Sequence, residues 1–311
     1  MTNKAPGEHS TVFSALIYII FLIISFFVIY PLVYVVSAAF SPGNSIASLN
    51  IVPFADGFTV KHFLHLFKNT NYGLWFMNTL KISLATSILT VITSSLSAYV
   101  FSRFHFTFKK SMLMSLLILQ IFPSFVGMVA IYVILYRIGG LDTLWGLVLV
   151  YTAGNIPYNT WMVKNYMDTI SKNLDEAARI DGAGHFRVFS TITLPIARPI
   201  ITFLGITSFT APWMDYIFPK MVLRSVEKQT LALGLFSFVS DKKNEFTTFS
   251  AGALIVAIPF VVKKKITNGI ATIKAPAEKV VNSFFLSETK LKSPRARVCF
   301  STERRTIFGK I

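Results

Sequence analysis

Long apolar segments separated by shorter polar ones dominate the pattern of the chain. Six of these runs approach the roughly 20 residues that an α-helix needs to cross the apolar core of a bilayer. They cover about residues 12–39, 74–101, 111–136, 144–162, 199–218 and 247–262. Because backbone polar groups in lipid must be satisfied within the segment itself, the pattern predicts an all-α, polytopic membrane protein with six transmembrane helices in a membrane domain, 12–262.

Some of the runs are irregular. The fourth contains Asn155, Pro157 and Asn159, so its helix is predicted to be kinked or locally unwound. The fifth contains Gly205 and Pro212. The sixth is short, because sixteen residues at about 1.5 Å each span only about 24 Å.

The first run lacks charge and is too long for the apolar region of a signal peptide. Ser37-Ala38-Ala39 nevertheless leaves cleavage by a signal peptidase as an alternative. The favoured interpretation is that the run is a membrane anchor and that residues 1–11 precede it as a cytoplasmic N-terminus.

Positive charges in short loops indicate orientation, because loops rich in Lys and Arg stay in the cytoplasm. Such cations follow the second, fourth and sixth runs: Arg103, Lys109 and Lys110; Lys164, Lys172, Arg179, Arg187 and Arg198; and Lys263, Lys264 and Lys265. These loops are predicted to be cytoplasmic, and an even number of spans places both termini there. The loop 220–246 also carries cations, but long loops have little weight in this rule.

Composition narrows the possible functions. The chain is 53% hydrophobic and 14% charged, whereas soluble domains average about 25% charged residues. More than half of its formal net charge of +16 comes from the tail 263–311. Cations beside apolar runs reflect membrane topology, so no nucleic-acid partner is expected. The lone Cys299 excludes an internal disulfide framework and a thiolate metal cluster.

The chain offers no chemistry of its own. Ion-coupled carriers usually need ionisable groups inside the membrane, but Lys81 and Asp215 lie near the ends of their runs. No phosphate-binding loop and no hydrolase motif occurs in the sequence. The histidines His62, His65, His105 and His185 are interpreted as interfacial polar residues. We expect a protein that is not an enzyme, has no cofactor or metal, and takes its energy from another subunit.

One polar cytoplasmic segment, 171–198, differs from its surroundings. Asn173 and Glu176 predict a capping box, with a short helix that starts at Leu174. Gly182 can take the left-handed conformation that ends this helix, and Gly184 loosens the joint before a second helix that continues to Pro195. The pattern is typical of a mechanical coupling element. An amphipathic linker that rests on the inner leaflet is the alternative.

Within this segment, Glu176-Ala177-Ala178, Gly182, Ile192 and Leu194-Pro195 resemble the "EAA" loop of permeases of bacterial ATP-binding-cassette (ABC) importers. The resemblance implies the six-helix permease fold of type I importers in the bacterial cell membrane. It also implies that this loop contacts an ATPase subunit, to which ATP binds. The implied coupling residues are Glu176, Ala177, Ala178, Arg179, Asp181, Gly182, Leu194 and Pro195.

Other stretches resemble the sugar branch of these permeases, most closely the maltose/maltodextrin type. They are Tyr30-Pro31-Leu32, Ala98 to Arg103, Asn155 to Trp161, Asp215-Tyr216-Ile217, Thr230 to Leu235 and Phe249 to Ala253. The resemblance implies an oligosaccharide substrate, a second permease subunit, two ABC ATPase subunits and an extracytoplasmic binding protein, all beside membrane lipid. A permease for another sugar or polyol, an ion-coupled carrier and a membrane scaffold are the alternatives.

Polar and aromatic side chains in the runs include Gln120, Asn155, Asn159, Trp213 and Tyr216. These groups can contact a sugar, but contacts between helices and interfacial placement are the favoured explanations, so no sugar-binding residue is assigned.

The end of the chain departs from the family pattern. After Val262 the sequence continues at once into Lys263-Lys264-Lys265 and a basic tail, where the family usually has more apolar residues. We interpret 263–311 as a divergent tail, a small deletion or a frameshift.

Overall fold

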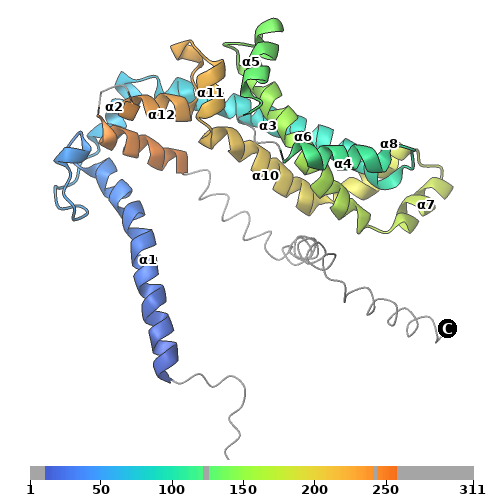
Figure 1. The fold of residues 1–311 in the computed structure, drawn as a ribbon, viewed down its shortest axis with the longest axis horizontal. Coiled ribbons are helices and arrows are strands. Elements are labelled where there is room, and N and C mark those ends of the chain that lie inside the picture. The colour runs from blue at the N-terminus through green and yellow to red at the C-terminus, as the bar shows by residue number, and fades with distance from the viewer. Residues whose placement is uncertain (1–10, 122–125, 241–243, 258–311) are drawn as a thin grey trace, which may run out of the picture. The chain divides into compact units, whose positions relative to one another are not determined.

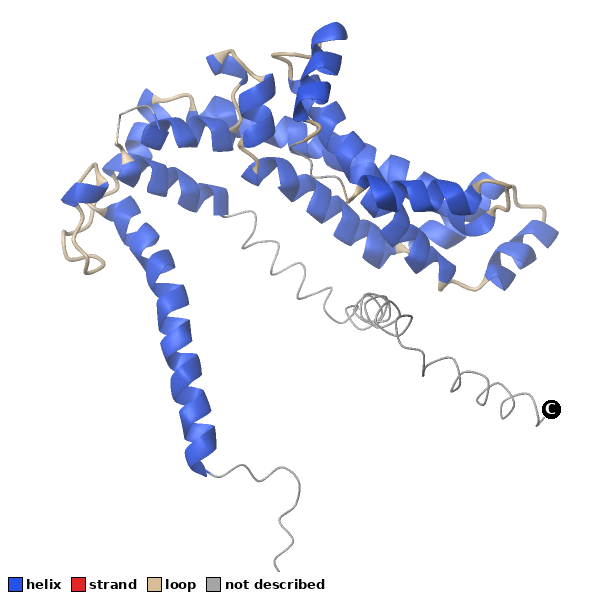
Figure 2. Ribbon diagram, in the orientation of Figure 1, coloured by secondary structure: helices blue, strands red, loops and turns tan. Residues whose placement is uncertain are grey.

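The computed structural model describes residues 11–121, 126–240 and 244–257, and every regular element in these ranges is a helix (Figures 1 and 2). The chain forms two compact units. Among the described residues, one combines residues 11–80 with 213–257, and the other covers residues 81–212. The all-α prediction is confirmed for the described residues.

The first unit contains one long helix, α1, and several short ones. α1 is uncharged and leaves its apolar side chains exposed along most of its length, as a helix surrounded by lipid would. The first turns of α3 also belong to this unit. The elements are α1 (Thr11–Phe40), η1 (Ile46–Ser48), α2 (Lys61–Asn69), the start of α3 (Tyr72–Arg103), α11 (Ile217–Val222), η3 (Val226–Lys228), α12 (Leu231–Ser240) and the helix Phe246–Ala257.

Close packing holds α3, α12 and the helix Phe246–Ala257 together. The Tyr72 hydroxyl donates a hydrogen bond to the carbonyl of Gly252 at 3.2 Å. A Cβ added at Gly234 would overlap the ring of Trp75, so only glycine lets α12 approach α3 this closely.

His62 is buried rather than interfacial, which corrects the prediction. Its Nε2 lies 3.0 Å from the carbonyl oxygen of Ser41 and 2.9 Å from that of Gly43, and its Nδ1 lies 3.2 Å from Thr248 Oγ1. Burial lowers the pKa of His62 and favours the neutral ring. The imidazole therefore ties α2 to two segments that are distant in sequence.

The second unit is a bundle around the later part of α3. Its elements are α4 (Lys109–Leu119), α5 (Met128–Arg137), α6 (Leu144–Asp168), α7 (Lys172–Ile180), α8 (His185–Val188), the π-helical turn η2 (Phe189–Thr193), α9 (Leu194–Ile196) and α10 (Arg198–Met214). The core is formed where α3, α6 and α10 meet, by Ala98, Tyr99, Val163, Met167, Ile170, Phe189, Ala197, Ile200 and Leu204.

The helices match the apolar runs in part. Within the described ranges, two helices, Phe13–Phe40 and Tyr72–Arg103, are long and apolar enough to cross a membrane. A third qualifies if His185–Ile196 and Arg198–Met214, which are bent by 82°, count as one span. The complete six-helix topology remains a prediction, and residues 258–262 of the sixth run lie outside the described ranges.

Two predictions about individual runs are wrong, and a third is wrong in part. The run 111–136 holds two helices, α4 and α5, instead of one. α6 continues through Pro157, so the predicted local unwinding does not occur, while the alternative of a kink stays a prediction; Asn159 Nδ2 donates to the carbonyl of Asn155 at 2.8 Å. The fifth helix, α10, ends at Met214, where Asp215 accepts a hydrogen bond from the Ile217 amide and starts α11.

Candidate functional site

The segment predicted as a coupling element folds into two helical parts joined by a tight turn. α7 starts at Lys172, because the Ser171 side chain accepts a hydrogen bond from the Asn173 amide at 3.4 Å. The helix therefore starts two residues before the predicted Leu174, and the predicted capping box of Asn173 and Glu176 is wrong. Both side chains are exposed instead.

The turn after α7 is fixed by hydrogen bonds at its C-terminus. The Ala183 amide donates to the Ala178 carbonyl at 2.9 Å, and the Gly182 amide donates to the Arg179 carbonyl at 3.0 Å. Gly182 has φ +85°, in the left-handed region. This pair of bonds is a Schellman motif, and it confirms the predicted role of Gly182 as the helix terminator. Gly184, by contrast, has φ −70° and needs no special freedom.

The second part continues inward. α8 leads into the π-helical turn η2 and then α9, and Val188, Phe189 and Thr193 are buried. Phe189 packs against the ring of Tyr99 with centroids 5.1 Å apart, and the Tyr99 hydroxyl donates to the His185 carbonyl at 3.3 Å. This half of the segment is thus anchored to the core of the second unit.

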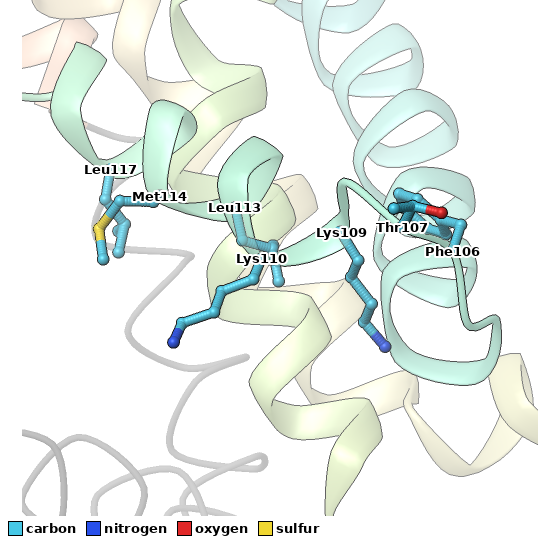
Figure 3. Close-up of a pocket in the computed structure, with 7 residues that line it drawn as sticks. All are labelled: Phe106, Thr107, Lys109, Lys110, Leu113, Met114 and Leu117. Carbon is cyan, nitrogen blue, oxygen red and sulfur yellow. The ribbon is translucent and has the colours of Figure 1, made fainter.

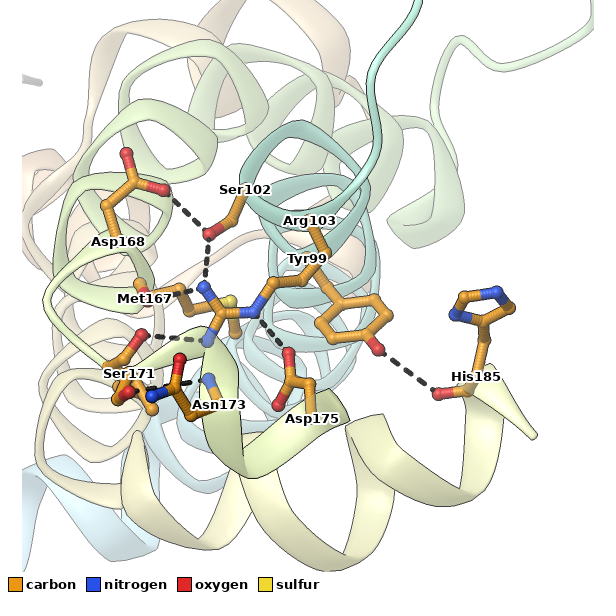
Figure 4. Close-up of polar contacts among 10 residues, drawn as sticks. Tyr99, Ser102, Arg103, Met167, Asp168, Ser171, Asn173, Asp175 and His185 are labelled. Carbon is orange, nitrogen blue, oxygen red and sulfur yellow. Dashed lines mark hydrogen bonds and ion pairs between the residues drawn. The ribbon is translucent and has the colours of Figure 1, made fainter. Parts of the chain in front are cut away.

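A buried ion pair holds α7 (Figure 4). Arg103 Nε, at the end of α3, lies 2.5 Å from Asp175 Oδ2, and the two side chains are 6% and 10% exposed. The remaining guanidinium nitrogens donate to the carbonyls of Met167 and Ile170, at the end of α6, at 3.2 and 3.1 Å. One arginine therefore joins α3, the end of α6 and α7.

A second carboxylate completes the network. Ser102 donates to Asp168 Oδ1 at 2.7 Å, and Arg103 donates to Ser102 Oγ at 3.2 Å. Lys164 pairs with Asp168 at 2.6 Å. The sequence had pointed to Arg103 as a topology signal and as the end of a stretch that resembles the family, but not as a partner of Asp175.

The structure divides the expected coupling residues into an outer and an inner group. Glu176, Ala177, Arg179, Asp181 and Gly182 are exposed on α7 and its terminating turn, and Ala178 is half-buried there. Leu194 and Pro195 are half-buried in α9, where Leu194 packs against the core. The two groups therefore have different surroundings.

Apolar side chains add to the outer group. Ile180 is 87% exposed and Phe186 is 74% exposed, on either side of Gly182, and Leu174 is also exposed. Large apolar side chains grouped on an exposed surface usually mark an interaction site. The sequence reasoning missed Ile180, although an apolar residue directly before an Asp-Gly turn was a possible signal.

This surface has the character of a contact site. Among the residues that the structure describes, no group of three or more His, Cys, Asp or Glu side chains could hold a metal ion. What the arrangement offers is a rigid, partly apolar projection tied to the ends of two long helices.

Comparisons with known proteins identify a matching family model and similar proteins. Residues 90–276 match the model of the binding-protein-dependent transport system inner membrane component. The chain is 40% identical over 259 residues to the maltodextrin transport system permease protein MdxG of Bacillus subtilis, which covers 81% of this chain and 92% of that protein.

Two further relatives and one solved structure are similar. The galactooligosaccharides transport system permease protein GanQ of Bacillus subtilis is 38% identical, over 79% of this chain and 87% of that one. The maltodextrin permease MalD of Streptococcus pneumoniae is 36% identical, over 83% and 94%. A chain of a bacterial ABC transporter involved in alginate import shares the fold, with a TM-score of 0.75, 18% identity and coverage of 86% and 99%.

The Schellman turn gives a first test. Gly182→Ala forces an L-residue into the left-handed region, which costs roughly 1–2 kcal/mol, whereas neither glycine has atoms within 4 Å of an added Cβ. We expect faster amide hydrogen exchange at the end of α7 in Gly182→Ala and unchanged exchange in the matched control Gly184→Ala. Equal exchange in both variants would contradict the assigned turn.

The ion pair gives a second test. Asp175→Ala leaves Arg103 buried without its carboxylate, and breaking a buried pair typically costs about 3–5 kcal/mol. We expect the thermal unfolding midpoint of the purified protein to fall by several degrees. Glu176→Ala, at the exposed neighbouring position, should leave it nearly unchanged.

The double variant Arg103→Met with Asp175→Leu removes both charges and should recover most of the loss. An equal effect of Asp175→Ala and Glu176→Ala would show that the pair does not hold α7.

Proposed function

Since the chain belongs to the family of inner-membrane components of binding-protein-dependent transport systems, we propose that the exposed surface around Gly182 is where it receives energy from an ATPase subunit. As a permease subunit of an ABC transporter the chain is non-catalytic and binds no cofactor; ATP is bound by the ATPase. The observation that carries the proposal is the exposure of Ile180 and Phe186 on the α7–α8 segment, whose inward-facing side chains are buried.

The chemistry of this surface suits a protein partner. Burying a large apolar side chain contributes about 1.5–3 kcal/mol, so Ile180 and Phe186 supply affinity. Glu176, Arg179 and Asp181 supply charges at the rim, and Ala177 and Ala178 allow close approach. Leu194 and Pro195 connect this contact to the core, where they support the docking surface from behind.

We further propose the membrane arrangement. α1, α3, the pair α4 and α5, α6, α10 and the run 247–262 form six spans with both termini in the cytoplasm, so that α7 and α8 lie on the cytoplasmic side. The positive charges near α4, α6 and α7 favour this orientation. The chain then forms half of a translocation pathway beside a second permease subunit, two ATPase subunits and an extracytoplasmic binding protein.

The proposed substrate is a neutral oligosaccharide, with maltodextrin favoured. Two of the relatives are named for maltodextrin transport and one for galactooligosaccharides. A galactooligosaccharide is therefore the second candidate. No residue is assigned to sugar contact, because Asn159 is engaged with its own helix and Trp213 is buried against Phe76.

The docking proposal is tested at Ile180. Ile180→Asp places a charge within the proposed apolar contact and should reduce co-purification of the ATPase subunit by at least about tenfold, which corresponds to roughly 1.4 kcal/mol. Asn173→Asp introduces the same charge at an exposed position on the same helix and should have little effect. Undiminished co-purification of the ATPase subunit with the Ile180→Asp variant would refute the docking proposal.

The substrate proposal is tested with the reconstituted transporter. ATPase activity should rise when the cognate binding protein is loaded with maltodextrin, and galactooligosaccharide should be the weaker activator. Stimulation by galactooligosaccharide alone would favour the second candidate. Stimulation by neither would refute the oligosaccharide assignment while leaving the ATPase contact intact.

A further inference from the structure

A groove in the second unit lies at the start of α4 (Figure 3). It has a volume of about 370 Å³. Lys109 and Lys110 line one part, and Leu113, Met114 and Leu117 line the other. The groove thus combines two cations with an apolar trough.

The spacing explains this division. Lys110, Leu113, Met114 and Leu117 are separated by three, four and seven positions, so they share one face of the helix. In Figure 3 the side chains of Lys109 and Lys110 extend from the first turn of α4, and Met114 and Leu117 continue toward the helix end. A ligand along this face would meet positive charge first and hydrocarbon next.

The electrostatic surroundings favour an anion at the cationic end. α4 has no acidic residue in its first turn, so two lysines stand where the helix dipole is already positive. The positive charges of Lys164 and Lys172 also act on Lys109. Asp168 acts in the opposite direction, but this carboxylate is paired with Lys164.

We propose that the groove binds an anionic phospholipid, with its phosphate at Lys109 and Lys110 and an acyl chain along Leu113, Met114 and Leu117. Charge complementarity selects the occupant, because basic pockets beside membrane helices bind acidic headgroups. The apolar trough continues into an apolar run of the chain, as an acyl chain requires. Assignment to the inner leaflet rests on the proposed orientation, whereas binding itself does not.

The lipid would lie close to the helices that hold the coupling element. α4 packs against α6, and Lys109 interacts electrostatically with Lys164 and Asp168 at the end of that helix. Asp168 in turn accepts from Ser102, next to Arg103. A bound headgroup therefore reduces the repulsion among cations at one side of this network.

The test is native mass spectrometry of the full chain in its purified transporter complex, with phosphatidylglycerol added. Each lysine near the surface contributes about fivefold to binding of an acidic lipid. Lys110→Gln should therefore weaken phosphatidylglycerol binding about fivefold, and Lys110→Arg should restore it. Lys220→Gln, which removes an exposed lysine of the first unit, is the matched control and should leave binding unchanged, with the basic tail present in every variant.

Two further arms distinguish other occupants. Phosphatidylcholine should bind less well and inorganic phosphate should not compete at millimolar concentration. Full competition by inorganic phosphate would assign the groove to a soluble anion. Equal binding of both lipids would contradict the proposal that the lysines select an acidic headgroup.

A photoactivatable phosphatidylglycerol should label peptide 106–117 in the complex. If Lys110→Gln and Lys220→Gln bind the lipid equally, or if the groove is labelled only after the second permease is removed, the proposal is overturned. Because these readouts do not use ATPase activity, they fail independently of the proposed coupling function.

Discussion

The buried ion pair between Arg103 and Asp175 is the interaction on which the candidate coupling site depends. Two charges taken out of water lose hydration, and their attraction compensates only if the remaining donors are also satisfied. Here the other guanidinium nitrogens reach the carbonyls of Met167 and Ile170. The arginine thus uses carbonyls at and just after the end of α6 as well as a carboxylate of α7, and it fixes where α7 leaves the bundle.

With its base fixed, α7 can carry an exposed apolar surface without collapsing onto the bundle. A flexible loop with Ile180 and Phe186 would bury these side chains against its own core. The Schellman turn at Gly182 prevents this. Its two hydrogen bonds fix the turn of the chain after α7 and keep both residues exposed. The turn at Gly182 therefore makes the apolar surface both rigid and exposed.

Much of this site could be predicted because its signals are local. Gly182 ends a helix through its own backbone freedom, and the spacing from Glu176 to Pro195 lies within a single segment. The cap was misplaced because Ser171 and Asn173 are both good N-cap residues and differ by two positions. The pair of Arg103 and Asp175 could not be predicted, since an arginine beside an apolar run reads equally well as a topology signal.

The spans show the same limit at a larger scale. Apolar content reports the surroundings of a segment but not whether its helix is continuous, so the division of 111–136 into α4 and α5 was not visible. Pro157 removes one backbone donor, yet α6 continues through it, as helices in membrane proteins tolerate when neighbours satisfy the freed carbonyl.

Three helices, α3, α6 and α10, contribute to one core in the second unit. Arg103 and Phe189 attach α7 and α8 to that core, so a force on the exposed turn reaches all three helices through packed side chains, which resist deformation because interiors are dense. In the proposed function, the ATPase subunit imposes the movement from outside the membrane, and this stiff connection transmits it to the membrane helices.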